Sequence, residues 1–162
     1  MKLNIGCGNN MMKDYINIDL HPVQAKDYIW REMDIMHIDT HFTSNSVDEI
    51  YASHLFEHLS HYEITTLLFK LHGILKPSGK LIIITPNFLR MILKLKEETS
   101  LKEFSSVDIM FLKFFSTEDE SLHKSIWYDD IGIWYLTREG LFEVKTFTFP
   151  SELEIKLEAI KI

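Results

Sequence analysis

The run Leu81-Ile82-Ile83-Ile84 constrains the fold more than any other segment of the chain. Every position in it is apolar, so a strand formed there has two apolar faces. Strands of that kind lie in the middle of parallel sheets, where helices cover both sides of the strand. The run therefore predicts an α/β fold with a mostly parallel sheet and helices on both faces.

Other segments supply the remaining elements of that fold. Strands are expected at residues 2–5, 15–19, 28–32, 47–53 and 80–85. Helices are expected at residues 61–75, from 87 onwards and at 129–139, where apolar side chains recur at helical spacing. Ser60 and Glu63 form a capping box before the first of these helices, and residues 76–79 form a turn after it.

The C-terminal segment changes to a strand-like pattern. Residues 141–149 are rich in Phe and Thr, and residues 153–161 alternate apolar with charged side chains. Pro150-Ser151 separates the two runs, a pattern typical of an antiparallel hairpin. The predicted architecture is a mostly parallel sheet with an antiparallel C-terminal hairpin.

Composition points to one globular domain spanning residues 1–162. Cys7 is the single cysteine, so no internal disulfide forms, and no apolar run reaches the length of a membrane span. The first residues enter a strand without a signal peptide, which predicts a cytoplasmic location. The formal net charge of -7 argues against general binding to nucleic acid, which requires a basic surface.

Gly6-Cys7-Gly8 follows the first predicted strand. Glycines without Cβ atoms at the carboxyl end of a strand let backbone N–H groups approach an anion or a nucleotide. Met11 stands where a dinucleotide fingerprint has its third glycine. This substitution argues against a nicotinamide-dependent oxidoreductase, which is one alternative for such a loop.

Asp19 ends the second predicted strand, where a carboxylate accepts both hydroxyls of a ribose lying across the strand tips. The competing interpretation is that Asp19 caps the turn before Pro22. Gly8 and Asp19 are eleven residues apart, so the first crossover helix is nearly absent, and a pyrophosphate lacks its usual binding site. Asp34 follows the third strand and is either a partner for an adenine amino group or an ordinary loop residue.

Six segments carry the motifs of the chain, namely Leu3–Asn9, Asn17–Leu20, Asp34–Ile35, Ser46–Ile50, Ser53–Leu59 and Leu75–Leu81. Taken in this order, they resemble class I S-adenosylmethionine-dependent methyltransferases, most closely the type 11 group in a short form without N-terminal helices. The resemblance covers residues 2–87 well and the rest of the chain loosely. It implies a Rossmann-like sheet of about seven strands with S-adenosylmethionine bound across the strand tips.

The resemblance also implies which residues hold the cofactor. Asn4, Gly6, Cys7 and Gly8 are expected to line the methionine side of the cofactor. Asp19 is expected to bind the ribose and Asp34 the adenine, and Ser53 and His54 are expected to border the methyl group. The expected cofactor-binding residues also include Asn9, Leu20 and Ile35. Asn4 is a departure, because many members have an acid there that holds the amino group of the methionine. An amide oxygen can still accept that hydrogen bond.

The activity implied by the resemblance is methyl transfer to a small polar acceptor, such as a sugar or a cell-surface polysaccharide precursor. The alternative is a cofactor-binding domain without catalysis. A hydroxyl acceptor requires a base, for which His54 is the first candidate, followed by His58 and His123. His58 is otherwise a structural residue and His123 a surface residue. Residues 98–128 are predicted to form a lid over the acceptor, or alternatively a helix packed on the core.

His54-Leu55-Phe56-Glu57-His58 also fits H-x-x-E-H, the zinc motif of one class of hydrolase. That motif requires a helix, on which histidines four residues apart share one face. Here a predicted strand runs into the motif, and the next helix begins only after Ser60. In an extended segment the two histidines do not converge on one ion, so no metal is expected.

Overall fold

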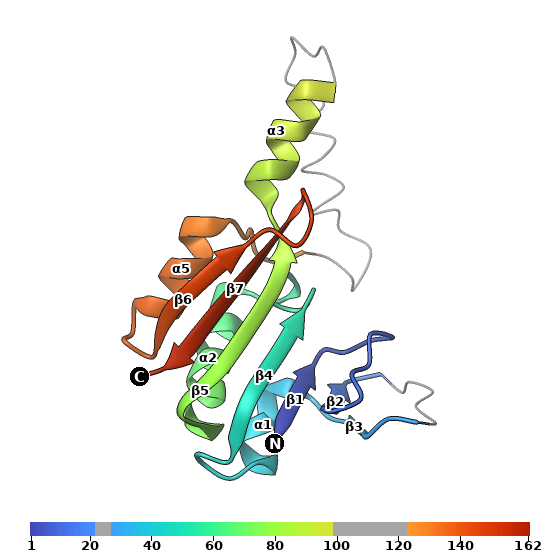
Figure 1. Cartoon of the computed structure of the whole chain (residues 1–162), viewed down its shortest axis with the longest axis vertical. Coiled ribbons are helices and arrows are strands. Elements are labelled where there is room, and N and C mark those ends of the chain that lie inside the picture. The colour runs from blue at the N-terminus through green and yellow to red at the C-terminus, as the bar shows by residue number, and fades with distance from the viewer. Residues whose placement is uncertain (22–26, 99–122) are drawn as a thin grey trace.

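The computed structural model of the protein describes residues 1–21, 27–98 and 123–162. The described strands are β1 (Lys2–Ile5), β2 (Ile16–Asp19), β3 (Trp30–Glu32), β4 (Val47–Ser53), β5 (Leu75–Pro86), β6 (Phe142–Thr148) and β7 (Glu154–Lys161). They form one seven-stranded sheet in the order β3-β2-β1-β4-β5-β7-β6 (Figure 1). The predicted α/β class, with a mostly parallel sheet and an antiparallel C-terminal hairpin, is confirmed, and each predicted strand is present.

The strands from β1 to β5 pair in parallel, and the C-terminal strands are antiparallel. β1 lies between β2 and β4, and β5 pairs with β4. The predicted hairpin of β6 and β7 forms, and β7 inserts between β5 and β6. Ile155, Leu157 and Ala159 of β7 are buried, whereas the positions between them are partly exposed. The alternation in the sequence thus sets which side of β7 faces the core.

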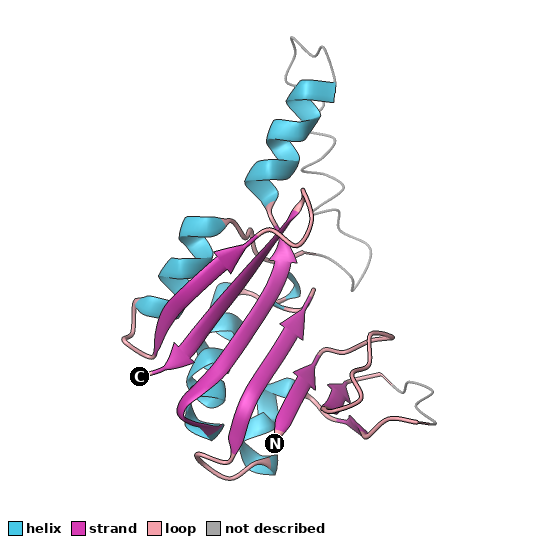
Figure 2. Cartoon of the chain, viewed as in Figure 1, coloured by secondary structure: helices cyan, strands magenta, loops and turns pink. Residues whose placement is uncertain are grey.

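The described helical segments are η1 (Ile35–His37), α1 (Ile38–His41), η2 (Phe56–His58), α2 (His61–Ile74), α3 (Phe88–Glu98) and α5 (Asp129–Thr137). Helices α1, α2 and α5 lie on the same side of the sheet, and α3 extends beyond the ends of the strands (Figure 2). His61 of α2 hydrogen-bonds the Tyr135 hydroxyl of α5 at 2.9 Å, which joins the two helices. Within the described ranges no helix combines the length and apolarity needed to cross a bilayer.

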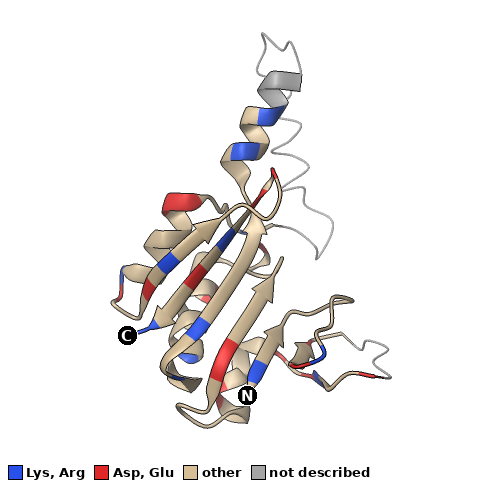
Figure 3. Cartoon of the chain, in the orientation of Figure 1, with Lys and Arg blue, Asp and Glu red and all other residues tan. Residues whose placement is uncertain are grey.

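The other side of the sheet differs from the prediction. Residues 6–15, which join β1 to β2, contain no helix, as the short spacing from Gly8 to Asp19 predicted. The side chains on this face include the partly exposed Glu49, Lys156 and Glu158. Figure 3 shows acidic and basic positions interspersed on these strands. Helices were expected on both faces, but in the described part of the chain they cover one, because this crossover is too short to hold a helix.

Helix α2 supplies much of the core beneath the sheet. Its buried side chains are Ile64, Leu67, Leu68, Leu71 and Ile74. The predicted capping box is present, because Ser60 Oγ accepts from the Glu63 N–H at 3.4 Å and Glu63 Oε2 accepts from the Ser60 N–H at 2.8 Å. The predicted turn at residues 76–79 follows the helix but falls within β5, whose register against β4 shifts there.

Helix α5 packs against β7 at Gly132. A Cβ at this position would lie 2.4 Å from Leu157 Cδ1 and 3.4 Å from Trp127 Cε3. Trp127 is 1% exposed and stacks on Tyr135 with ring centroids 5.2 Å apart. The absence of a side chain at Gly132 therefore allows α5 to pack closely against Leu157 of β7.

Gly132→Ala should lower the free energy of unfolding by about 1–2 kcal/mol, because overpacking against the buried Leu157 outweighs the better helix propensity of Ala. The matched control is Gly73→Ala on α2, where no atom lies within 4 Å of a Cβ. The control should be neutral or stabilising by up to about 1 kcal/mol. Denaturant unfolding measures both changes, and equal stabilities of the two variants would contradict the close packing of α5 on β7.

Candidate cofactor site and adjoining histidine cluster

The carboxyl ends of β1, β2 and β4 meet at one edge of the sheet, because these strands are parallel neighbours. Residues 6–8 follow β1, Asp19 ends β2 and His54 follows β4. Helix α3 leaves from the same edge after β5 (Figure 1). This edge therefore brings together the main positions at which the sequence predicts cofactor binding.

The glycine loop after β1 depends on two residues with left-handed backbone. Gly6 has φ of 61° and Gly8 has φ of 47°. A Cβ at Gly6 would lie 2.8 Å from Leu55 Cδ1, whereas a Cβ at Gly8 would meet nothing within 4 Å. Both positions favour glycine for their backbone conformation. Gly8 also leaves open space at the rim of the loop.

Asp19 links this loop to the tip of β2. Its Oδ2 accepts a hydrogen bond from the Gly8 N–H at 2.8 Å, and its Oδ1 accepts one from the His21 N–H at 3.0 Å. The second bond is the turn cap considered as the competing interpretation of Asp19. The bond from the Gly8 N–H has another consequence, because it holds the Asp19 carboxylate against the glycine loop.

Asn4 and Asn17 form a buried network beneath the loop that the sequence analysis did not predict. Asn4 is 2% exposed and Asn17 is fully buried. Asn4 Nδ2 donates to Asn17 Oδ1 at 2.8 Å and to the Asn10 carbonyl at 2.9 Å. Alternation of apolar and polar residues signalled the strands here, but it gave no sign that the two amides meet.

Cys7 is buried within the loop and is 4% exposed. Its N–H donates to the Ile18 carbonyl at 3.1 Å. Burial, and secondarily the nearby Asp19 carboxylate, raise the pKa of the Cys7 thiol to about 11. The thiol is therefore protonated at neutral pH and packs in the loop as a small apolar group.

The remaining predicted cofactor residues of this region lie on neighbouring segments. Asp34 caps η1, since its Oδ1 accepts from the Met36 N–H at 2.8 Å, and its other oxygen lies 3.2 Å from His37 Nδ1. Leu20 is 58% exposed beside Asp19. Asn9 is exposed in the turn after the glycine loop, and Ile35 is half-buried.

His54 lies between two carboxylates at the end of β4. It has φ of 54°, a left-handed conformation that is uncommon outside glycine and is often found at functional sites. Its Nδ1 lies 3.2 Å from Glu57 Oε1, and its Nε2 lies 2.7 Å from Glu154 Oε1. Hydrogen bonds from Ser151 and from His54 lower the pKa of the Glu154 carboxyl. Ser53, the last residue of β4, is half-buried beside His54.

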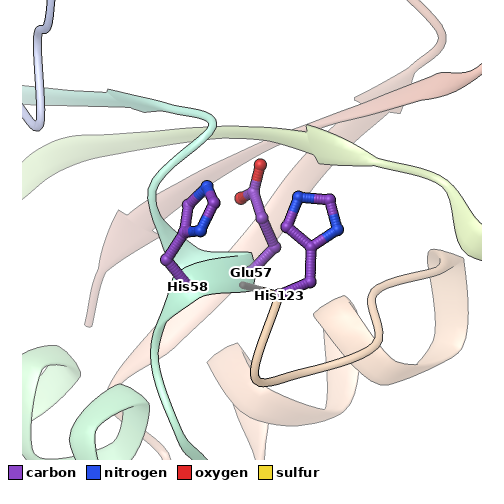
Figure 4. Close-up of side chains that lie close together, drawn as sticks. All are labelled: Glu57, His58 and His123. Atoms are coloured by element: carbon purple, nitrogen blue, oxygen red, sulfur yellow. The ribbon is translucent and has the colours of Figure 1, made fainter. Parts of the chain in front are cut away.

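Glu57, His58 and His123 form a group of titratable side chains next to this edge (Figure 4). One nitrogen or carboxylate oxygen from each lies within 4.8 Å of the others. The rings of His58 and His123 meet edge to face with centroids 5.0 Å apart. Burial and the neighbouring His58 lower the pKa of His123, whereas burial raises the pKa of the Glu57 carboxyl. His123 was expected at the surface, but it is half-buried in this group.

The H-x-x-E-H motif does not lie on an α-helix. His54 follows β4, and Glu57 and His58 lie in the short 3₁₀ segment η2. The ring of His54 contacts Glu57 and Glu154, and the group that gathers around Glu57 takes its second histidine from His123. The helical arrangement that a zinc hydrolase of this class requires is therefore not formed.

Asn87 was predicted only as the start of a helix, and in the structure it also bonds to Asp129 and lines a hollow. It is 1% exposed, its Oδ1 caps α3 by accepting from the Arg90 N–H at 3.2 Å, and its Nδ2 donates to Asp129 Oδ1 at 2.8 Å. It lines a hollow of about 350 Å³, together with Leu89, Arg90, Leu93, Lys94, Asp129 and Glu152. An Asn before a helix signals the cap, but a contact across 42 residues leaves no local pattern.

The predicted lid at residues 98–128 falls largely on residues 99–122, which lie outside the described residues. The described end of this stretch is anchored on η2. The N–H groups of Lys124 and Ser125 donate to the Glu57 carbonyl at 2.7 and 3.1 Å, and Ser125 Oγ donates to the Phe56 carbonyl at 3.1 Å.

Known proteins resemble this chain in sequence and in fold. The family model described as a methyltransferase domain matches residues 3–83. No curated protein matches the sequence. Among solved structures, a SAM-dependent methyltransferase from Archaeoglobus fulgidus is 17% identical with a TM-score of 0.67, and the alignment covers 99% of this chain and 85% of that chain.

Two further structures resemble the fold to a similar degree. A SAM-dependent methyltransferase from Methanosarcina mazei is 16% identical with a TM-score of 0.67, covering 99% of this chain and 92% of that one. An S-adenosylmethionine dependent methyltransferase from Mesorhizobium loti is 12% identical with a TM-score of 0.62, covering 99% and 90%. At these identities the likeness establishes the fold.

Cys7 should resist thiol reagents in the native protein at pH 8, because it is buried and its thiolate is scarce. Reaction with dithionitrobenzoate should be slow before unfolding and should reach one equivalent after it, in line with the single cysteine. The raised pKa of Cys7 also affects stability. The free energy of unfolding should fall as the pH rises from 9.0 to about 11, because the thiol of the unfolded chain ionises at a lower pH than the thiol of the folded chain. Rapid and complete reaction of the native protein would contradict the burial of Cys7.

Proposed function

Since the chain belongs to the methyltransferase-domain family and its cofactor is S-adenosylmethionine, we propose that it transfers a methyl group to a small polar acceptor, such as a sugar or a cell-surface polysaccharide precursor. The cofactor supplies an electrophilic methyl group on a sulfonium. The protein then has to hold the acceptor in line with that methyl carbon. The observation that carries the proposal is the hydrogen bond from the Gly8 N–H to Asp19, which joins the glycine loop to the tip of β2.

The nucleoside is proposed to lie over the tips of β1 and β2. The left-handed Gly8 leaves open space at the rim, and the half-buried Asp19 carboxylate faces that rim. A carboxylate there can accept hydrogen bonds from both ribose hydroxyls. The exposed side chain of Leu20 offers an apolar surface for the adenine, and Asp34 and Ile35 follow on the next segment.

The methionine end is proposed to lie along Gly6, Cys7, Gly8 and Asn9. Asn4 fits this end only in part. Both hydrogens of its amide are used within the network with Asn10 and Asn17, so Oδ1 is the atom left to accept from the methionine ammonium. Asn4 therefore serves first as a support of the loop and second as an acceptor.

The hollow beside α3 supports a polar acceptor. It lies directly after β5 at the same edge of the sheet as the glycine loop. Its lining includes Arg90, Lys94, Asp129 and Glu152, which offer charged hydrogen-bond donors and acceptors. A polyhydroxylated molecule matches such a lining better than an apolar one does.

His54 is the proposed base for an acceptor that loses a proton. Its side chain is 46% exposed at the end of β4, so an acceptor can reach it. Contacts of its two ring nitrogens with Glu57 and Glu154 fix the orientation of the ring. His58 and His123 are the second candidates, and both are more enclosed than His54.

Asp19→Ala should weaken the binding of S-adenosylhomocysteine by at least about tenfold, because two hydrogen bonds to a charged carboxylate are lost. Isothermal titration calorimetry on the full chain measures the affinity. Asp14→Ala is the matched control, since Asp14 is an exposed acid in the same connection between β1 and β2 and should bind as the wild type does. Unchanged affinity in Asp19→Ala would contradict the placement of the ribose.

A parallel titration with NAD tests the oxidoreductase alternative. NAD should not bind, because Met11 stands in place of the third glycine and residues 6–15 form no helix whose N-terminus could bind a pyrophosphate. Binding of NAD without binding of S-adenosylhomocysteine would overturn the proposed function.

His54→Gln should lower the rate of methyl transfer to a hydroxyl acceptor by at least about a hundredfold, the usual contribution of a general base. The assay follows tritium from the labelled cofactor on a panel of sugars and nucleotide sugars. His41→Gln, an exposed histidine of α1, is the control and should turn over normally. Full activity of His54→Gln would remove His54 as the base. Absence of transfer by the wild type to every acceptor, despite cofactor binding, would support a non-catalytic cofactor-binding domain.

A further inference from the structure

The group of Glu57, His58 and His123 brings together two segments that are distant in the sequence (Figure 4). Glu57 and His58 lie on η2, and His123 lies in the segment before α5. The Glu57 carbonyl accepts backbone hydrogen bonds from Lys124 and Ser125, so the position of His123 beside η2 is held by the main chain. The grouping is therefore a product of the fold and not of flexible side chains alone.

The Glu57 carboxylate is the least expected member of this group. The residue is 2% exposed. In the part of the chain that the structure describes, neither Oε1 nor Oε2 accepts a hydrogen bond, although Oε1 lies 3.2 Å from His54 Nδ1. Burying a carboxylate without hydrogen bonds is costly unless a cation compensates it. This carboxylate lies between the rings of His58 and His123, each of which offers an imidazole nitrogen as a possible ligand (Figure 4).

One carboxylate oxygen and two imidazole nitrogens are the ligand set of many zinc centres with an open coordination position. Their ligand atoms lie within 4.8 Å of one another. Around tetrahedral zinc, donor atoms are about 3.3 Å apart, so small rotations of these side chains would close the site. His54, between Glu57 and Glu154, is placed to orient the Glu57 carboxylate from outside the ligand set.

We propose that Glu57, His58 and His123 bind one zinc ion, or a similar divalent transition-metal ion. The ligand set differs from the H-x-x-E-H motif, because His123 takes the position that His54 would occupy. The ion would link the segment before α5 to η2, which follows β4 next to the proposed cofactor edge. The proposal concerns binding and does not depend on methyl transfer.

The test uses the full chain, freed of metal with a chelator and then titrated with zinc chloride at pH 7.5. Elemental analysis after gel filtration should give one zinc per chain. Titration with cobalt(II) should produce the visible absorption of a four- or five-coordinate ion, which zinc then displaces. Zinc content far below one per chain, or a cobalt spectrum of the hydrated ion only, would overturn the proposal.

The ligand assignment is tested with Glu57→Gln and His123→Gln, each of which should weaken zinc binding by more than about a hundredfold, beyond the loss expected for an outer residue. His54→Gln should weaken it by about tenfold. His41→Gln on α1 is the matched control and should bind as the wild type does. Far-ultraviolet circular dichroism and the melting temperature show whether each variant folds. Wild-type affinity in folded His123→Gln would overturn the assignment, and if that variant does not fold, His58→Gln provides the same test.

Discussion

The hydrogen bond from Asn4 Nδ2 to Asn17 Oδ1, buried and 2.8 Å long, is the interaction on which the cofactor edge depends. Parallel strands are usually joined by a crossover of a dozen or more residues that includes a helix. Here residues 6–15 alone join β1 to β2, and their backbone groups need partners. Asn17 supplies some of these partners by bonding to the Met12 N–H and to the carbonyls of Met12 and Tyr15, and it also bonds to the Ile29 carbonyl just before β3. The amide pair thus replaces the bonds of a helix and holds the glycine loop beside Asp19.

This short crossover has two consequences for the molecule. The face of the sheet that it crosses carries partly exposed charged side chains, while α1, α2 and α5 gather the core on the other face. The chemistry is concentrated at the carboxyl edge, where the left-handed His54 turns the chain from β4 into η2. Glu57 on η2 then holds the segment before α5 through its carbonyl. The cofactor edge and the histidine cluster are therefore connected through a few residues of main chain.

Much of the fold could be predicted from the sequence because it follows from local periodicity. The apolar run at Leu81–Ile84 and the alternation from Leu153 onwards set the sheet, and Ser60 with Glu63 set the start of α2. The short helical turns η1 and α1 were missed, because seven residues, 35–41, are too few to establish a helical period. Among the described residues the second predicted helical layer is not found, since an apolar strand indicates cover on both faces but does not say what provides it. The contact of Glu57 with the segment at His123 joins distant residues, and no local pattern reports such a contact.

A crystal structure of the full chain with S-adenosylhomocysteine bound would test the placement of the cofactor most directly. We expect the nucleoside to lie over the tips of β1 and β2 and both ribose hydroxyls to donate hydrogen bonds to the Asp19 carboxylate. A nucleoside bound elsewhere on the molecule, or a ribose in this place without contact to Asp19, would contradict this placement.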